Sequence, residues 1–298
     1  MKGYKGFNKD MTCRGMQYEE GKIYKMEEEP KCCKRGYHFC ENPIDCLGYY
    51  SPNESIYRQV EAIGKISKDE DTSDTKIATN EIKIGAKIDF QTMVKMAIEF
   101  TYKHCTKKGK GNNKRSDKSV ASNTGDYSVA SNTGDYSVAS NTGYKSVASN
   151  TGYKSVASNT GYNSVASNTG YKSVASNTGN YSVASNTGYN SVASNTGYNS
   201  VASNTGNYSV ASNTGNYSVA SNLGQKSISS CLGVRGQVSG KKGTWLVVAE
   251  WIQDEDWNWE VKEVKTVKVD GKKIKENTYY TLEHGEFVEK GSISDDND

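Results

Sequence analysis

Residues 119–127 read Ser119-Val120-Ala121-Ser122-Asn123-Thr124-Gly125-Asp126-Tyr127, and this nine-residue unit decides the fold. It repeats twelve times without a gap, from Ser119 to Lys226, as S-V-A-S-N-T-G followed by two variable positions; only the twelfth copy departs, with Leu223 in the threonine place. Two decayed copies follow, at 227–235 and 236–244. Self-similarity over more than a third of the chain outweighs any local motif when the architecture is inferred.

The repeat predicts a β-solenoid. S-V-A-S is a short strand signal with one β-branched residue, and N-T-G is a turn signal. We expect the seventh-position glycine to supply a positive φ at a tight corner. Nine residues are too few to close a coil around side chains, so two units, about 18 residues, should form each coil. Valine at the second position should then form an apolar ladder inside each sheet, and Val120→Asp, or the same change at any matching valine, should disrupt two neighbouring coils.

Positions eight and nine of the unit vary, and each of the first eleven copies carries one tyrosine there. These positions follow the corner glycine, so we expect exposed tyrosine columns along the edges of the solenoid. The rings could simply stabilise coil on coil, or they could offer an aromatic and polar surface to a partner. The residues are Tyr127, Tyr136, Tyr144, Tyr153, Tyr162, Tyr171, Tyr181, Tyr189, Tyr198, Tyr208 and Tyr217.

Other nonapeptide classes fit less well. Calcium-binding repeats need Gly-Gly-x-Gly-x-Asp, and only two copies here carry Asp. A Ser, Asn and Thr face could order water, as in ice-binding solenoids, but no other sequence feature supports that function. The unit also resembles the SVA-type repeats of trimeric adhesin heads, although no secretion or anchor segment accompanies it.

Composition bounds the remaining possibilities. The chain has 298 residues, of which only 34% are apolar, and a net charge of +3 that does not indicate a nucleic-acid partner. Neither a signal peptide nor a run of 18 apolar residues is present, which predicts a soluble cytoplasmic protein. Five of the seven cysteines lie in the first 46 residues, and free thiols are expected. Residues 107–118 are basic and are expected to form a linker.

Residues 1–106 are expected to form an α+β domain. Strand-like segments occur at 21–24, 36–39 and 57–63, and a strand pair is predicted over 75–88. Asn42 and Pro43 should start a short helix, as N-cap and first residue. Asp89 should cap a longer helix, in which apolar residues from Phe90 to Tyr102 share one face.

This N-terminal stretch resembles a domain of unknown function found mainly in phage and prophage proteins. The resemblance rests on three segments and covers nearly all of the first 90 residues. It implies an origin in phage or another mobile element, but no activity. The segments are Tyr4-Lys5-Gly6-Phe7, Cys13-Arg14-Gly15-Met16-Gln17-Tyr18-Glu19 and Gly36-Tyr37-His38-Phe39-Cys40-Glu41-Asn42-Pro43.

A second resemblance is to ADP-ribosyltransferases of the diphtheria-toxin type. Residues 5–6 would match the His-Gly strand, residues 36–40 the strand before a helix, and residues 80–84 the strand with the catalytic glutamate. Lys5 stands where the family has its ribose-binding histidine, and His38 where it has a stacking tyrosine. The resemblance implies NAD as ligand, an aromatic shelf from Tyr37 and His38, and Glu81 as the carboxylate that stabilises an oxocarbenium ion. Alternatively, Glu81 is a surface residue and His38 a packed one.

A metal centre is the other candidate site near the N-terminus. Cys32, Cys33, His38, Cys40 and Cys46 are ligand types for zinc, but their spacing lacks paired C-x-x-C knuckles. We therefore predict no metal and no cofactor, with NAD implied only by the resemblance to ADP-ribosyltransferases.

Residues 245–291 are expected to form a small β cap over the solenoid end, followed by an acidic tail at 292–298. Strands are predicted at 245–251, 261–269, 279–282 and 287–288, with a hairpin signal at Asp270-Gly271 and a turn at His284-Gly285. Trp257 and Trp259 are candidates for an oligomer contact.

Together these features predict a mainly β protein: a nonapeptide solenoid between an α+β domain and a β cap. We expect a non-catalytic, phage-derived binding or scaffold protein that contacts a protein partner, for example to inhibit a host defence system. The alternative is an ADP-ribosyltransferase, or a degenerate relative that binds an NAD-like ligand.

Overall fold

The computed structural model describes residues 1–68, 74–104, 112–114 and 117–292. The chain divides into two compact units, Met1–Phe100 and Thr101–Asp298, and each is described by itself. The second unit confirms the predicted β-solenoid, which has about seven turns of roughly 18 residues. No helix among the described residues is long and apolar enough to cross a membrane.

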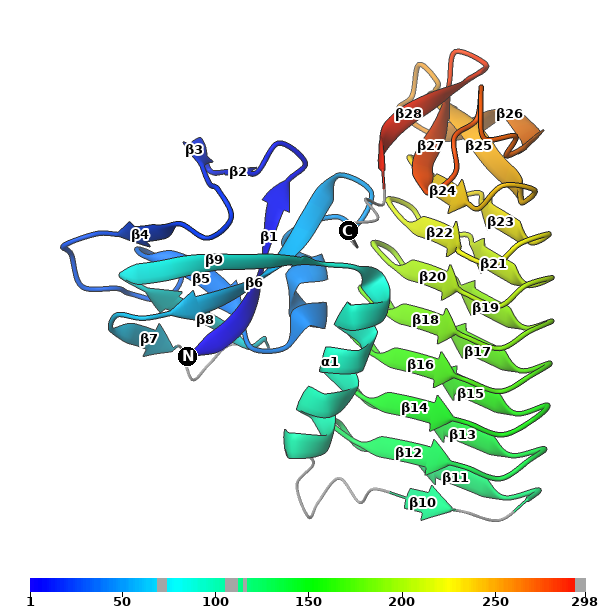
Figure 1. The fold of residues 1–298 in the computed structure, drawn as a ribbon, viewed down its shortest axis with the longest axis horizontal. Coiled ribbons are helices and arrows are strands. Elements are labelled where there is room, and N and C mark those ends of the chain that lie inside the picture. The colour runs from blue at the N-terminus through cyan, green and yellow to red at the C-terminus, as the bar shows by residue number, and fades with distance from the viewer. Residues whose placement is uncertain (69–73, 105–111, 115–116, 293–298) are drawn as a thin grey trace. The chain divides into compact units, whose positions relative to one another are not determined.

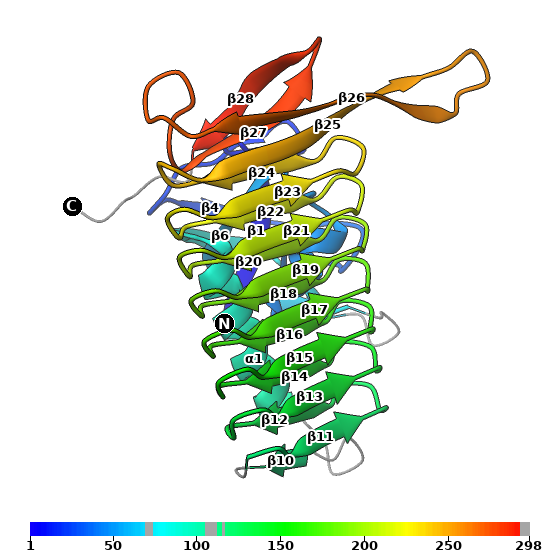
Figure 2. The same cartoon turned by 90° about the vertical axis from the view of Figure 1, so that its right-hand side faces the viewer.

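Successive repeat strands alternate between two parallel sheets (Figures 1 and 2). Val129 pairs with Val147, and Val138 with Val156, so each strand pairs with the strand 18 residues later. The strands are β10 (Asn112–Lys114), β11 (Val120–Asn123), β12 (Val129–Asn132), β13 (Val138–Asn141), β14 (Val147–Asn150), β15 (Val156–Asn159), β16 (Val165–Asn168), β17 (Val174–Asn177), β18 (Val183–Asn186), β19 (Val192–Asn195), β20 (Val201–Asn204), β21 (Val210–Asn213), β22 (Val219–Asn222), β23 (Ile228–Cys231) and β24 (Gln237–Gly240).

Alanine, not valine, lines the space between the two sheets, so the prediction that valine lies inside is wrong; the valines stack in register on the opposite face of each strand. In β13 and the strands stacked on it, the second and fourth residues are partly exposed while the third and fifth are buried. Ala121, Ala130 and Ala139 are fully buried and belong to one core cluster that continues along both sheets. Val120 is 53% exposed, so Val120→Asp is not expected to disrupt the coils. The matching valines of the other sheet are at most 2% exposed, so an aspartate there would bury a charge; they are Val129, Val147, Val165, Val183, Val201 and Val219. A narrow roll accepts a methyl group where an isopropyl group would overpack it.

Asparagine and serine fill the corners of the coil with hydrogen bonds. The Nδ2 of Asn168 donates to the carbonyls of Ser155 and Val174, at 2.9 and 3.2 Å. Its Oδ1 accepts from the backbone N–H of Gly170. These contacts satisfy the polar groups that a small-residue core would otherwise bury without partners.

The corner glycine is needed for close stacking, and the prediction that it supplies a positive φ is wrong. A Cβ added to Gly170 would lie 1.8 Å from the carbonyl oxygen of Gly152, one coil earlier. The positive φ falls on the ninth residue instead, for example 51° at Tyr127 and 56° at Lys172. The corner therefore turns after the glycine rather than at it.

Two hairpins close the end of the solenoid, one on each sheet, as expected for a cap. They are built from β25 (Trp245–Gln253) with β26 (Trp259–Lys268), and β27 (Thr278–Glu283) with β28 (Glu286–Ser292). β25 continues the parallel ladder on β23, whereas β27 pairs antiparallel with β24. Asp270-Gly271 lies between strands of different sheets, so this dipeptide forms no hairpin and the prediction there is wrong. The turn at His284-Gly285 joins β27 to β28 as predicted.

The first unit is a seven-stranded sheet with the order β4-β9-β6-β1-β5-β8-β7. Two strands form over 75–88 as predicted, β8 (Lys76–Thr79) and β9 (Glu81–Ile88), but they do not pair with each other. Asn80 alone separates β8, which pairs with β5, from β9, which pairs with β6. The strands are β1 (Lys2–Asn8), β4 (Ile23–Lys25), β5 (Tyr37–Cys40), β6 (Ser55–Ala62), β7 (Ile66–Lys68), β8 (Lys76–Thr79) and β9 (Glu81–Ile88), with a separate small pair, β2 (Thr12–Cys13) and β3 (Met16–Gln17).

Both predicted helix starts are confirmed. The 3₁₀ helix η1 (Pro43–Gly48) begins after Asn42, whose side chain accepts a hydrogen bond from the Ile44 N–H. The helix α1 (Phe90–His104) begins after Asp89, which accepts from the Thr92 N–H at 2.7 Å. Most of the predicted linker at 107–118, and the tail at 292–298 apart from Ser292, lie outside the described residues.

Candidate functional sites

The predicted tyrosines form two continuous columns, one at each edge of the solenoid. Ring centroids of successive tyrosines lie 5.1–6.2 Å apart throughout. The first column comprises Tyr127, Tyr144, Tyr162, Tyr181, Tyr198 and Tyr217. The second column comprises Tyr136, Tyr153, Tyr171, Tyr189 and Tyr208.

The position of each tyrosine within its unit sets the ring geometry. Neighbours that both hold the eighth position stack nearly parallel, at 11° for Tyr153 with Tyr171 and 6° for Tyr171 with Tyr189. A change between the eighth and ninth positions tilts the pair, to 81° for Tyr136 with Tyr153. Both arrangements are favourable for aromatic pairs.

Asp or Asn occupies the eighth position when tyrosine takes the ninth, and this choice has a structural reason. Asp135 Oδ1 accepts from the backbone N–H of Tyr153, 18 residues later, at 2.8 Å. Asn180 makes the same bond to Tyr198 at 2.9 Å. The short acceptor thus satisfies a backbone donor of the next coil, which a tyrosine ring at that position cannot do.

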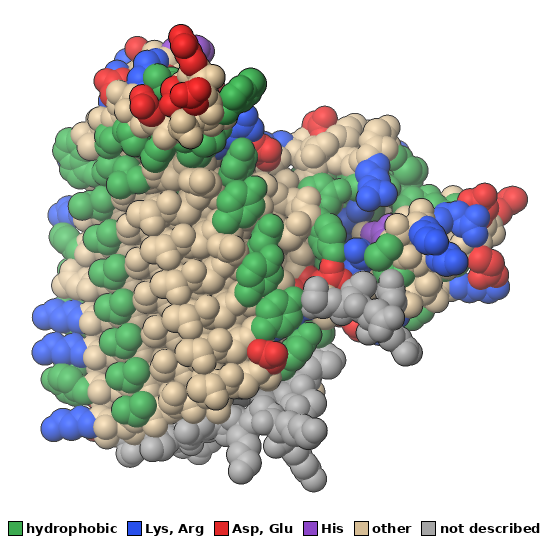
Figure 3. Space-filling view, turned by 180° about the vertical axis from the view of Figure 1, so that it is seen from behind, with side chains coloured by type: hydrophobic (Ala, Val, Ile, Leu, Met, Phe, Trp, Pro, Cys, Tyr) green, Lys and Arg blue, Asp and Glu red, His purple; other side chains and the backbone are tan. Residues whose placement is uncertain are grey.

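Cations are interleaved with the rings. Lys154 Nζ lies 5.4 Å from the Tyr136 ring centre and 5.3 Å from that of Tyr153, within cation–π range. In the second column, rings such as Tyr136 and Tyr208 are 50% and 46% exposed. Figure 3 shows green side chains in columns along the rod with blue side chains along one edge. The columns therefore stabilise the stack and still present aromatic surface.

Trp257 and Trp259 lie in the β25–β26 hairpin. Trp257 is 77% exposed between the two strands, and Trp259 is 39% exposed at the start of β26. Val261 and Val264, further along β26, are each 51% exposed. The hairpin therefore carries an apolar patch that its own unit does not cover.

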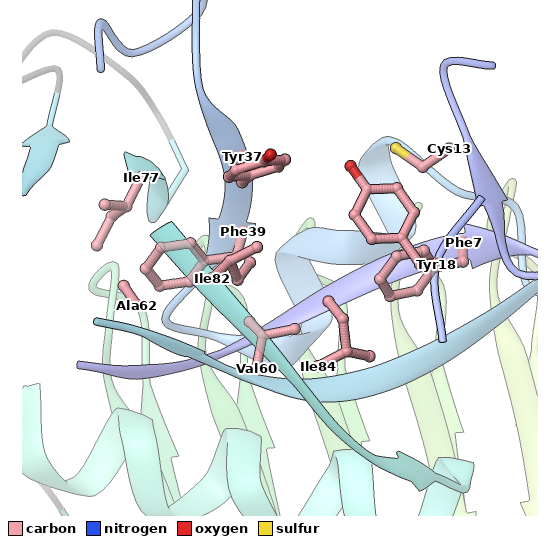
Figure 4. Close-up of a cluster of buried hydrophobic side chains, with 10 residues drawn as sticks. All are labelled: Phe7, Cys13, Tyr18, Tyr37, Phe39, Val60, Ala62, Ile77, Ile82 and Ile84. Atoms are coloured by element: carbon pink, nitrogen blue, oxygen red, sulfur yellow. The ribbon is translucent and has the colours of Figure 1, made fainter. Parts of the chain in front are cut away.

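A pocket of about 410 Å³ opens in the first unit, on one side of the sheet. Its wall comes from β1, the β2–β3 turn, the segment 33–36, β5, the residues after η1, and Lys76 of β8. Figure 4 shows the hydroxyls of Tyr18 and Tyr37 and the thiol of Cys13 on the same side of the core cluster beneath it. A Cβ on Gly6 would lie 2.4 Å from Tyr50, so this glycine makes room for the Tyr50 ring over the strand.

Lys5 and His38 both line this pocket, but Glu81 does not. Lys5 of β1 lies opposite Arg58 of β6, and Arg58 lies opposite Lys87 of β9. Lys87 is therefore the β9 residue level with Lys5 across the sheet. Glu81 lies six residues earlier on that strand, roughly 20 Å along it. Its carboxylate is 3.7 Å from Lys25 instead. The three residues named by the resemblance to ADP-ribosyltransferases therefore do not meet in one site.

His38 is held as a neutral imidazole. Its Nε2 accepts a hydrogen bond from the Cys33 N–H at 3.1 Å, which requires that nitrogen to be unprotonated. Burial lowers the pKa of His38, and the positive charges of Lys5, Arg14 and Lys76 lower the pKa further. In this setting His38 acts as an acceptor rather than as a cation.

The cysteines considered as zinc ligands fall into separate places. Cys32 and Cys33 lie side by side, with sulfurs 3.9 Å apart, and burial raises the pKa of Cys32 to about 11. The pKa of the buried Cys40 is raised by its hydrogen bond to Cys46 and by burial. No group of three or more His, Cys, Asp or Glu side chains in the described residues is arranged to hold a metal ion.

Sequence reasoning missed most of the pocket wall. Arg14, Tyr18, Tyr49, Tyr50 and Lys76 line it beside Lys5. Cys13, Arg14 and Tyr18 are predicted only as part of a family motif. Acidic and basic residues are nearly equal in number over the first 76 residues, so composition gives no signal that these cations and tyrosines converge.

Comparison with known proteins gives one match, and that match lies within the first unit. No curated protein and no solved structure gives a significant match to the chain. Residues 1–96, which contain the whole pocket wall, match the family described as a domain of unknown function, DUF7666.

Proposed function

We propose that this protein is a non-catalytic binding or scaffold protein whose two tyrosine columns contact a protein partner. The observation that carries the proposal is the continuous contact between successive tyrosine rings. Eleven rings form two columns, and several of them are about half exposed. Tyrosine is enriched at protein interfaces because it offers rigid apolar area with a polar end. The first unit would provide a second contact.

The second column offers the cleaner test. Tyrosines at the eighth position are changed to Gln and those at the ninth to Asn, residues that other copies of the repeat already carry there. The changes are Tyr136→Asn, Tyr153→Gln, Tyr171→Gln, Tyr189→Gln and Tyr208→Asn. A matched control changes exposed threonines at the same corners, Thr151, Thr169 and Thr187, to Ser.

Both variants are compared with the wild type for protein partners from bacterial extract, and each partner is then tested as a purified protein. We expect the tyrosine variant to lose at least one direct partner and the threonine control to keep it. If the tyrosine variant keeps every partner while its circular dichroism is unchanged, the columns only stabilise the rod.

The more specific proposal places the protein in the cytoplasm of a bacterial host, as a phage product that inhibits a defence system. Its support is the resemblance noted for the first unit. The test is plating efficiency of phage on cells that carry individual defence systems, with and without this protein. Unchanged plating across all systems would argue against inhibition.

Self-association through the β25–β26 hairpin is part of the proposal, because the exposed Trp257 and Trp259 lie beside an open strand edge on β26. Light scattering of the wild type and of a Trp257→Ser, Trp259→Ser variant measures it. The same mass for both at high concentration would exclude this contact.

The competing function is NAD-dependent ADP-ribosyl transfer. The separation of Glu81 from Lys5 and His38 disfavours it. Transfer of labelled ADP-ribose by the wild type, abolished by Glu81→Ala, would nonetheless establish that activity.

A further inference from the structure

The pocket of the first unit is lined by positively charged side chains. Its lining includes five cationic side chains and, within the described residues, no Asp or Glu. Arg35 and Lys76 have carboxylates near them, at 3.8 Å from Glu28 and 4.0 Å from Asp74. The other three have no carboxylate within ion-pair distance in the described chain: Lys5, Arg14 and Lys34.

Lys5 is the most telling of these cations because it is only 6% exposed. Its Nζ donates to the Cys13 sulfur at 3.2 Å and lies 5.2 and 5.9 Å from the ring centres of Phe7 and Tyr50. A thiol and two ring faces compensate a buried ammonium weakly compared with an anion. An anionic group entering the pocket would provide the missing partner.

Neutral donors and flat rings complete the wall. Burial raises the pKa of Tyr18 and of Tyr37, so their hydroxyls stay protonated and can donate. Burial also raises the pKa of Tyr50, whose hydroxyl lies 2.8 Å from the Cys13 sulfur. The tyrosine rings and Phe39 form apolar surface suited to a planar group.

We infer that this pocket binds a small organic anion in which a planar ring carries a phosphate or a carboxylate group. Lys5 and Arg14 contact the anionic group, with Arg14 able to bond two oxygens at once. The ring lies against the tyrosines. A volume of about 410 Å³ falls in the range of ligand pockets and leaves room for substituents on the ring. This site is independent of the tyrosine columns.

Isothermal titration of the full-length protein tests the inference with four probes: phenyl phosphate, benzoate, phenol and inorganic phosphate. We expect phenyl phosphate or benzoate to bind at least about tenfold more tightly than phenol and inorganic phosphate, since each of the latter lacks one half of the ligand. The stronger of the two identifies the anionic group. No binding of either aryl anion at millimolar concentration would overturn the inference.

Two variants locate the binding site. Lys5→Met removes the buried charge but keeps the length of the side chain, and Arg14→Gln removes a second cation. Each variant should weaken binding of the aryl anion by about tenfold or more. Lys83→Met, which removes an exposed lysine from β9 of the same unit, is the matched control and should leave affinity unchanged.

Equal losses in all three variants would indicate a general charge effect and overturn the assignment to this pocket. If Lys5→Met fails to fold, Arg14→Gln alone decides, because Arg14 is exposed and carries no core packing. Unchanged affinity in a folded Arg14→Gln protein would then count against the inference.

Discussion

At the scale of single residues, the same residues recur from copy to copy of the repeat because of the contacts they make within the coil. No catalytic role is needed to explain them. The seventh-position glycines stack so closely that a side chain cannot enter: the Cβ of Gly188 would lie 1.7 Å from the oxygen of Gly170. The ninth position carries the strain instead, since Tyr, Lys and Asn all adopt positive φ there. Such a conformation costs roughly 1–2 kcal/mol for a residue other than Gly or Asn.

Gly170→Ala should therefore destabilise the solenoid by about 1–3 kcal/mol, as expected of an overpacked site. Gly125→Ala is the matched control, because the same position in the first coil has nothing within 4 Å of an added Cβ. Chemical denaturation of both variants measures the difference. Equal stability of the two proteins would contradict the stacking explanation.

His38 should make the stability of the first unit depend on pH. Its pKa is lowered in the folded state, so the unfolded chain binds the proton more readily. The stability that neutral His38 contributes to the folded unit is fully present above the unfolded pKa of about 6.5. It is lost as pH falls from there towards the lower folded pKa.

Thermal unfolding at pH 7.5 and pH 5.5 measures this effect. The wild type should lose more stability on acidification than His38→Gln, which keeps an acceptor for the Cys33 N–H without titrating. His284→Gln, in the cap, serves as control and should behave as the wild type. An identical acid response in His38→Gln would show that other groups are responsible.

At the scale of elements, the pleat of each strand decides which residues can be large. S-V-A-S-N offers Val and Ser to one face and Ala and Asn to the other, and the structure places Ala and Asn inside. Neither set is plainly apolar, so hydrophobic alternation cannot choose between them. Alanines of both sheets pack against one another in one core cluster, so the contact between the sheets decides which face lies inside.

Ala175→Leu should destabilise the solenoid by about 1–3 kcal/mol, since Ala175 is fully buried in the narrow interior. The adjacent Val174 is partly exposed, and Val174→Leu should change stability by less than about 0.5 kcal/mol. Denaturant midpoints of the two variants compare neighbouring residues of one strand. Greater damage from Val174→Leu would mean that valine does belong to the core.

At the scale of the whole molecule, the solenoid has two sheets with different ends. The β25–β26 hairpin continues the sheet of β23, and the β27–β28 hairpin continues the sheet of β24. Deleting one full coil, residues 155–172, returns every later strand to its own sheet. Deleting one unit, residues 155–163, moves every later strand into the opposite sheet and brings each hairpin to the wrong ladder.

We expect the 18-residue deletion to fold with a cooperative melt close to that of the wild type. The nine-residue deletion should lose cooperativity or aggregate, because each cap hairpin then meets the wrong sheet. The tyrosines of all later copies also move to the opposite column. Circular dichroism and light scattering distinguish the two. Normal folding of the nine-residue deletion would show that the two sheets are interchangeable.

The sequence by itself determined the solenoid, its 18-residue coil, the two helix starts and the two tyrosine columns. These features depend on neighbours nearby in the chain or on an identical unit one coil away, so the repeat makes them visible. Only the tertiary structure decided that alanine lies inside, that glycine is needed for stacking, and that Lys5 and His38 share a pocket without Glu81. Those outcomes depend on the contact between sheets and on the order of strands, which bring together residues far apart in the chain.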